Sequence, residues 1–259
     1  MAVPIRKTAT DNVIHLNLRV VGGEKKVRYN KDGSVDKRHS NAVAGRSCEV
    51  YAFSTKEEIE AMIKVFNEKI ESAPDEDKRW IACRNKMLFL IGINLSLRIS
   101  DLVSLKWNFF LKDDMTFRDF YKIQPKKTRK YGKFVPLYFN DAVKKSIADY
   151  IKQYPIKDMD GCVFKSREGN GAITEKAVWK IIVDTAAKAG IEHNVGTHSL
   201  RKTFGYWVYH KAVDKNDALI ILQTIFNHSS PAVTSRYIGL TNEEVSDTFN
   251  SLNLGIDLF

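Results

Sequence analysis

The pattern of the sequence changes at Ser54, and this change constrains the fold more than any other feature. The run Ser54-Thr55-Lys56-Glu57 has the composition of a capping box, which begins a helix. Apolar residues then recur at helical spacing, at Ile59, Met62, Ile63, Phe66 and Ile70. Residues 1–53 instead show short alternating pieces between Gly- and Asn-containing turns, as in 49–53. The sequence therefore predicts a basic arm of short strands or disorder over residues 1–53 and a separate domain over residues 54–259.

The domain that begins at residue 54 is predicted to be mostly helical. Capping residues and apolar spacing predict further helices over 75–92, 141–151, 174–190, 198–210, 217–226 and 231–237. Two strands, 120–124 and 133–137, flank a turn that Pro125 and Gly132 bound. We therefore expect a mainly α domain with a small antiparallel β-sheet, an α+β fold.

The charge of the chain narrows the class of partner. A net charge of +10 and a pI near 9.3 favour a polyanion, and nucleic acid ranks ahead of a membrane. The sequence has no apolar run near the ~18 residues of a membrane span and no signal peptide, so we expect a cytoplasmic protein. Its three cysteines are scattered and no Cys/His cluster has zinc spacing, so we expect free thiols, no metal and no cofactor.

A set of polar residues could handle a phosphodiester. His198 and Arg201 are three residues apart and share one helix face, and His228 and Tyr237 follow them. Breaking a DNA strand without a metal requires a nucleophile, positive charge on the nonbridging oxygens and an acid for the leaving oxygen. With Arg98 and Lys127 this set supplies all three. Taken singly, each residue has an ordinary structural explanation, such as packing for a Tyr or a solvated helix face for an Arg.

The order Arg98, Lys127, His198-x-x-Arg201, His228, Tyr237 resembles the tyrosine recombinase (phage integrase) family over roughly residues 54–259. The stretch 92–107, with its Gly-bearing turn before Arg98 and Leu-x-Trp after it, is similar to the first-arginine box of that family. The resemblance implies that Tyr237 attacks phosphorus and holds the 3′ phosphate as a covalent ester. Both arginines would then stabilise the charge of the transition state, with His198 as the acid/base group and His228 as a hydrogen-bond donor.

The basic segment 122–133 contains the residue that the family assigns as acid for the leaving 5′ hydroxyl. Its Lys-Thr step aligns Lys127 with that residue, although Lys126 and Lys130 are close enough to remain alternatives. The same segment and helix face are predicted to contact DNA phosphates. The predicted DNA-binding residues are Lys126, Arg129, Lys130, Lys133 and Lys202.

The sequence departs from the commonest family pattern at three positions near these residues. Lys202 stands where His is frequent, and Asn227 replaces the usual Gly but tolerates left-handed geometry. Asp101 stands where Glu is common and is expected to form an ion pair that aims Arg98. The helical DNA-clamping domain that most family members carry before the catalytic one is not evident in residues 1–53.

The expected function is therefore site-specific recombination on double-stranded DNA, for integration, excision or inversion. A type IB topoisomerase and a catalytically silent DNA-binding accessory factor are the alternatives. We expect a homo-tetramer on paired DNA sites, a monomer in free solution and no membrane partner. The apolar C-terminal residues, including Phe249, Leu252 and Phe259, are predicted to dock on a neighbouring protomer, with packing on their own domain as the alternative.

Overall fold

The computed structural model describes residues 49–132 and 134–240, with the backbone alone for Thr128, Lys130 and Tyr131. These residues belong to one compact unit that begins at Glu49. Helices dominate the unit, and one two-stranded antiparallel sheet accompanies them, which confirms the predicted fold class. None of the helices in the described ranges is both long and apolar enough to cross a bilayer.

The first two helices follow their capping residues closely. Helix α1 spans Lys56–Glu71, and its N-cap is Thr55, one residue later than the predicted capping box. The Thr55 hydroxyl accepts from the Glu58 N–H over 3.1 Å, while the Glu58 carboxylate accepts from the Ser54 N–H over 2.7 Å. Helix α2 spans Glu76–Asn94, and its N-cap is Asp75, whose carboxylate accepts from the Lys78 N–H.

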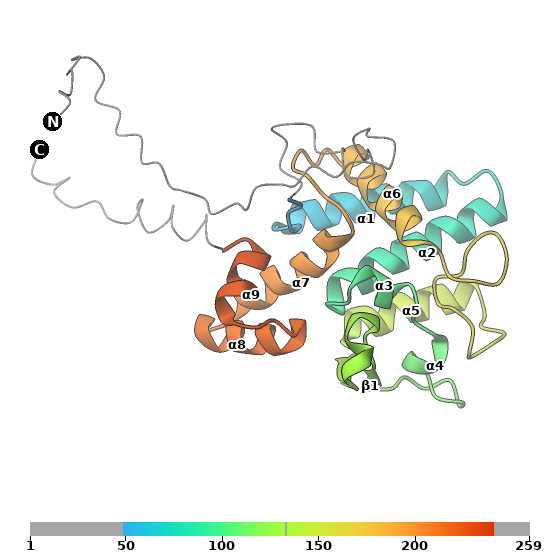
Figure 1. Cartoon of the computed structure of the whole chain (residues 1–259). Coiled ribbons are helices and arrows are strands. Elements are labelled where there is room, and N and C mark those ends of the chain that lie inside the picture. The colour runs from blue at the N-terminus through green and yellow to red at the C-terminus, as the bar shows by residue number, and fades with distance from the viewer. Residues whose placement is uncertain (1–48, 133, 241–259) are drawn as a thin grey trace, which may run out of the picture. The chain divides into compact units, whose positions relative to one another are not determined.

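Helix α2 is the centre of the main core. It packs against α1, against α5 (Asp141–Gln153) and against α7 (Thr197–Lys211), while α6 (Glu175–Lys188) contacts α1 and α7 (Figure 1). Phe66, Leu88 and Phe89 are fully buried where these helices meet. Burial of this apolar surface, at roughly 25 cal/mol per Å², fixes α2 and hence the segment that follows it.

A compact stretch with little regular structure follows α2. It contains two one-turn helices that the sequence pattern did not reveal, α3 (Ile99–Leu102) and α4 (Trp107–Phe110). Strand β1 (Phe120–Ile123) pairs with β2 (Val135–Tyr138), with Phe120 opposite Tyr138. Between the strands, the predicted turn is a 3-10 helix over Lys126–Tyr131 that ends at Gly132, whose φ is 68°.

Helices α7, α8 (Lys215–Phe226) and α9 (Pro231–Ile238) form a second, smaller core. Figure 1 shows α8 and α9 gathered beside α7 and away from α5. Phe226 and Ile238 are buried there, and α7 approaches them through Gly205. A Cβ atom at Gly205 would lie 2.5 Å from the Ile238 Cγ2 atom and 2.8 Å from the Phe226 ring, so only glycine permits this packing.

Residues 49–53 differ from their prediction as a strand. They have no regular secondary structure and pair with no strand among the described residues. Side chains of α7 bind them instead: Thr203 accepts from the Phe53 N–H over 2.8 Å, and the Trp207 indole donates to the Phe53 carbonyl over 2.9 Å. The rest of the predicted arm, residues 1–48, and the predicted C-terminal docking segment, residues 241–259, lie outside the described residues.

Candidate active site

Helix α7 places His198 and Arg201 on one face, as their spacing predicts. The Arg201 side chain is buried and donates to two carbonyl oxygens, of Ser96 over 2.7 Å and of Phe226 over 3.0 Å. Its guanidinium also lies 4.6 Å from the centre of the Phe226 ring. Burial lowers the pKa of Arg201 to about 10, so the group still carries its charge at neutral pH. Two of its five N–H donors bind these carbonyl oxygens, and the guanidinium also interacts with the Tyr237 hydroxyl.

Helix α9 brings the Tyr237 hydroxyl to the same place. It lies 3.4 Å from the His198 Nδ1 atom, so either group can donate to the other depending on the imidazole tautomer. Burial raises the pKa of Tyr237, while the positive charges of Arg201 and Arg98 act against this rise. The tyrosine therefore keeps its proton near neutral pH, and the two arginine charges offset part of the cost of forming the phenolate.

The pKa of His198 lies below its ordinary value. The ring is exposed on one side, but its partial burial against α9 is the largest cause, and nearby cations add to the effect. These cations are Arg201, Lys202, Arg98 and Lys127. His198 is therefore largely neutral near pH 7 and able to accept a proton.

His228 follows the end of α8, where Asn227 adopts φ 53° and ψ 50°. This left-handed residue ends the helix and turns the chain, as predicted for an Asn at this position. The His228 Nδ1 atom lies 3.1 Å from the Thr234 hydroxyl, and the ring stands edge-on to Tyr237 with centroids 5.1 Å apart. Burial and the charges of Arg201 and Arg98 lower the pKa of His228.

Arg98 is the N-cap residue of α3 and is partly exposed. Its charge acts on His198, His228 and Tyr237, which places it at the same centre. Two residues earlier, Ser96 has φ 55° and is buried. This strained conformation aims the Ser96 carbonyl at Arg201, and a non-Gly residue pays roughly 1–2 kcal/mol for it.

The 3-10 helix between β1 and β2 divides its basic side chains between two directions. Residues three apart eclipse in a 3-10 helix, and Lys126 and Arg129 accordingly line one cavity of about 370 Å³. Lys127 lies outside that lining, and its charge acts on His198 instead. Of the predicted alternatives with described side chains, Lys127 is therefore the one whose charge acts on His198.

Asp101 does not form the expected ion pair with Arg98 within the part of the chain that the structure describes. Its buried carboxylate accepts from the Lys126 N–H over 2.9 Å. The reason is geometric, because the start of the 3-10 helix leaves backbone N–H groups without partners and Asp101 lies where it can cap one. Asp101 thus ties the first-arginine segment to the turn that carries Lys127.

The predicted DNA-binding residues have different surroundings. Lys126 and Arg129 are exposed beside the site, whereas Lys202 is buried and its Nζ atom lies 3.0 Å from the Glu49 carboxylate. The structure therefore does not present Lys202 at the surface. The side chains of Lys130 and Lys133 lie outside the described residues.

Sequence reasoning missed two residues that position the predicted set. Ser96 orients Arg201 through its carbonyl, and a single sequence carries no signal for this backbone contact. Thr234 fixes His228, and its spacing of three from Tyr237 places the two on one helix face, so helical spacing could have indicated it.

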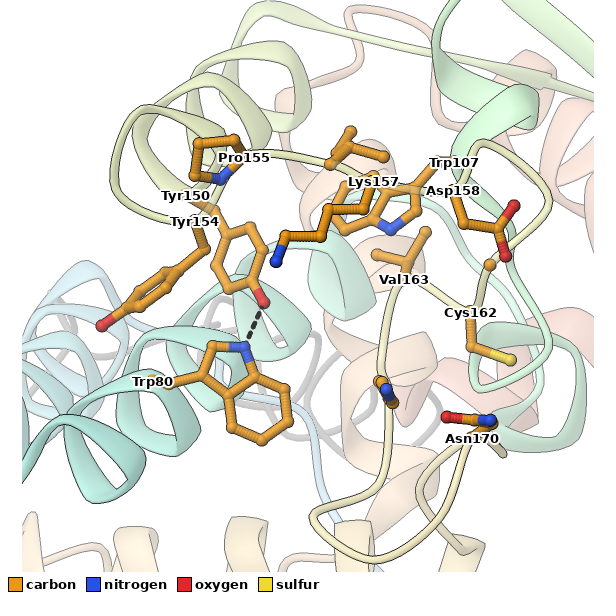
Figure 2. A pocket seen from close by; sticks show the side chains of 13 residues that line it. Trp80, Trp107, Tyr150, Tyr154, Pro155, Lys157, Asp158, Cys162, Val163 and Asn170 are labelled. Carbon is orange, nitrogen blue, oxygen red and sulfur yellow. Dashed lines mark hydrogen bonds between the residues drawn. The ribbon is translucent and has the colours of Figure 1, made fainter.

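Other cavities lie apart from this centre. One of about 560 Å³ is lined by aromatic and basic side chains, among them Trp80, Tyr150 and Lys157. Figure 2 shows the Tyr150 hydroxyl accepting the hydrogen bond from the Trp80 indole at its edge. None of the six predicted catalytic residues lines it. Among the described residues, no group of three or more His, Cys, Asp or Glu side chains is arranged to hold a metal ion.

Comparisons with known sequences identify a family for this chain. The model of the phage integrase family matches residues 53–244. A probable integrase/recombinase of Bacillus subtilis, YoeC, is 35% identical over 171 residues, which are 65% of this chain and 86% of that protein. The tyrosine recombinase XerA of Pyrococcus furiosus is 24% identical over 201 residues, 77% of this chain and 61% of the relative. The chain thus spans about three fifths of the length of this second relative.

Solved structures share the fold. The XerH site-specific recombinase in a post-cleavage complex with its palindromic difH substrate superposes with a TM-score of 0.57 and 18% identity, over 80% of this chain and 53% of that one. A lambda integrase tetramer bound to a Holliday junction gives a TM-score of 0.50 at 15% identity, over 76% of this chain and 50% of the other.

Proposed function

The chain belongs to the phage integrase family of tyrosine recombinases, and we propose that it cleaves and rejoins DNA through a covalent 3′-phosphotyrosyl intermediate. One observation carries the proposal. The Tyr237 hydroxyl, the His198 ring and the buried Arg201 guanidinium converge from α7 and α9, within reach of the charge of Arg98. A tyrosine among this many cations has the surroundings of a nucleophile that attacks a phosphate.

The cleavage step follows from these positions. The Tyr237 oxygen attacks phosphorus as its proton passes to His198, whose lowered pKa keeps it able to accept. Arg98 and the remaining N–H groups of Arg201 bind the nonbridging oxygens, and the Nε2 atom of His228 donates to one of them. The bond from phosphorus to the 5′ oxygen breaks, and Lys127 supplies the proton for that oxygen. Rejoining reverses these transfers, so no external energy source is needed.

The partner we propose is double-stranded DNA bound through the exposed cations beside the site. The XerH relative is described on a DNA substrate and the lambda integrase as a tetramer on a junction, which favours assembly on paired sites here. We further propose that residues 241–259 of a neighbouring copy occupy a largely apolar groove of about 730 Å³ between β2 and α8. Phe134, Tyr138 and Ile221 are exposed in this groove. If truncation after Thr241 abolishes cooperative unfolding, the segment belongs to its own domain instead.

Residues 1–53 are proposed as a DNA-contacting arm ahead of a catalytic domain over 54–259. Several lysines and arginines in this arm could each neutralise a phosphate and release a counterion on binding. Deleting residues 1–48 should therefore flatten the slope of log affinity against log salt, and residues 49–53 are kept because their backbone bonds to α7. An unchanged slope would show that the arm does not bind DNA.

The direct test is a denaturing gel of protein mixed with a nicked suicide substrate, which traps the covalent intermediate. Wild-type protein should form the adduct, and Tyr237→Phe should form none while binding DNA nearly as tightly. Tyr154→Phe is the matched control, because this tyrosine lines the separate cavity of about 560 Å³ and lies outside both the site and the groove. An adduct with Tyr237→Phe would exclude this nucleophile, and binding by wild type without any adduct would favour a silent accessory factor. Relaxation of supercoiled DNA by monomers without recombinant products would favour a type IB topoisomerase.

A further inference from the structure

The segment before helix α1 is held through its backbone by α7 and by the loop that precedes α7. The Asn194 side-chain amide donates to the Glu49 carbonyl over 2.7 Å. Four residues later, the Phe53 N–H and carbonyl bond to Thr203 and Trp207 of α7. Glu49 therefore reaches α7 from a backbone that is held at both ends of a short segment.

The Glu49 side chain neutralises a buried cation. Its carboxylate lies 3.0 Å from the Lys202 Nζ atom, and the Lys202 side chain is 8% exposed where that of Glu49 is 52% exposed. The same Nζ atom lies 5.7 Å from the centre of the Tyr237 ring. An ammonium this deeply buried is unfavourable without a counterion. The carboxylate is therefore what keeps the ammonium beside the ring.

One ammonium thus acts on two members of the site. It lies against the Tyr237 ring, and its charge is among those that lower the pKa of His198. His198 in turn contacts the Tyr237 hydroxyl. A displacement of Lys202 would alter both the support of the ring and the proton affinity of the group next to its hydroxyl.

We propose that Glu49 is a positioning residue for DNA cleavage: it holds the Lys202 ammonium beside Tyr237 and so couples the segment that precedes α1 to the nucleophile. This inference rests on the proposed function of Tyr237. An ion pair with a structural role alone would change the stability of the fold and leave the cleavage step as it was. The two roles can therefore be separated by measuring cleavage at saturating protein.

The experiment is a double-mutant cycle in the full chain with Glu49→Gln, Lys202→Met and both together. Single-turnover cleavage of the suicide substrate is followed across pH, with thermal unfolding of each variant alongside. Glu49→Gln should slow cleavage by about tenfold, since the unpaired ammonium turns toward solvent and ~1 Å of misplacement can cost ~100-fold. Lys202→Met should slow it similarly, and the double variant should be no slower than Lys202→Met, because Glu49 acts through Lys202.

The pH profile gives a readout that stability alone would not move. Loss of the ammonium raises the pKa of His198, so the limb that this group governs should move to higher pH in both single variants. Glu49→Asp keeps the negative charge but places it farther from the Lys202 ammonium. Its cleavage rate should fall between those of wild type and Glu49→Gln. Asp149→Asn, which breaks the exposed Lys145–Asp149 pair of 3.1 Å, should leave rate and profile unchanged.

Two results would overturn the inference while leaving the proposed function intact. One is wild-type cleavage and an unshifted profile in Glu49→Gln, even with lowered stability. The other is a double variant whose cleavage rate is reduced by the product of the two single-variant reductions. If wild-type protein forms no adduct that depends on Tyr237, the proposed function fails and this inference fails with it.

Discussion

The two halves of the site are held in different ways. In the nucleophile half (His198, Arg201, His228 and Tyr237, on α7 to α9), each side chain meets another side chain or a carbonyl of the protein. In the hairpin half (Arg98 and Lys127), the described residues provide no hydrogen bond to either side chain. In the proposed function, the first half is therefore formed before DNA binds, whereas the second half has its backbone in place and its charges directed to phosphate.

Because of this difference, substitutions in the two halves should differ in how much they change the stability of the fold. In the nucleophile half, Arg201 also satisfies two backbone carbonyl oxygens, so its loss should disturb the fold as well as the proposed reaction. Loss of either side chain of the hairpin half should affect the proposed reaction alone. Four measurements, in order of decreasing expected effect, test whether the division is this sharp.

The largest effect is expected in the hairpin half. Lys127→Ala should slow cleavage by ~100- to 10,000-fold, the usual contribution of a general acid. A substrate with sulfur in place of the 5′ bridging oxygen should restore much of the rate, because a thiolate leaves without a proton. Single-turnover cleavage of both substrates is the measurement. Lys126→Ala, which changes a side chain that lines the neighbouring cavity, is the control, and rescue of that variant would mean that the acid is misassigned.

The two arginines compare the halves directly. Arg201→Ala and Arg98→Ala should each raise the barrier to cleavage by about 2.7–4 kcal/mol, as loss of one preorganised donor does. Arg201→Ala should also lower the free energy of unfolding by about 1–3 kcal/mol for each carbonyl left without a donor. Arg98→Ala should change it by less than ~0.5 kcal/mol. Urea unfolding measures this contrast, and equal losses of stability would remove the distinction.

The anchor of the hairpin half should have a moderate effect. Asp101→Ala removes the acceptor for the Lys126 N–H and should slow cleavage by about tenfold through misplacement of Lys127. Asp101→Asn keeps an acceptor oxygen and should cleave at close to the wild-type rate. The sulfur-containing substrate should hide the Ala defect, since it needs no acid. Equal defects in the two variants would show that the charge of Asp101 matters more than its hydrogen bond.

The smallest effect is a pH dependence of stability that belongs to the nucleophile half. The pKa values of His198 and His228 are lowered in the folded chain, so the unfolded chain binds more protons in mild acid. Their contribution to stability is therefore complete above the ordinary pKa of ~6.5 and declines as pH falls toward the folded values. The free energy of unfolding should decrease over this range, and less steeply in His198→Gln/His228→Gln. A double variant with the wild-type slope would show that other groups control it.

The sequence predicted what depends on spacing and missed what depends on backbone contacts. His198 and Arg201 share a face because three residues nearly complete a helical turn, and Asn227 ends α8 because it tolerates positive φ. The one-turn helix α3 was missed because four residues are too few to show a period. The bond from Arg201 to Ser96, far apart in sequence, has no local pattern, and Lys202 was placed at the surface because its partner Glu49 belongs to another segment.

The position of Tyr237 relative to α7 depends on Gly205, a residue without a side chain. An added Cβ atom at Gly205 would lie 2.5 Å from the Ile238 methyl group, so only a hydrogen atom fits there. Tyr237 directly precedes Ile238. Replacing a helical glycine with alanine ordinarily stabilises a helix by roughly 0.5–1 kcal/mol. At this position the added methyl group would move α9 away from α7 and displace Tyr237 with it. A substitution that is usually conservative would here displace the Tyr237 hydroxyl from His198 and Arg201.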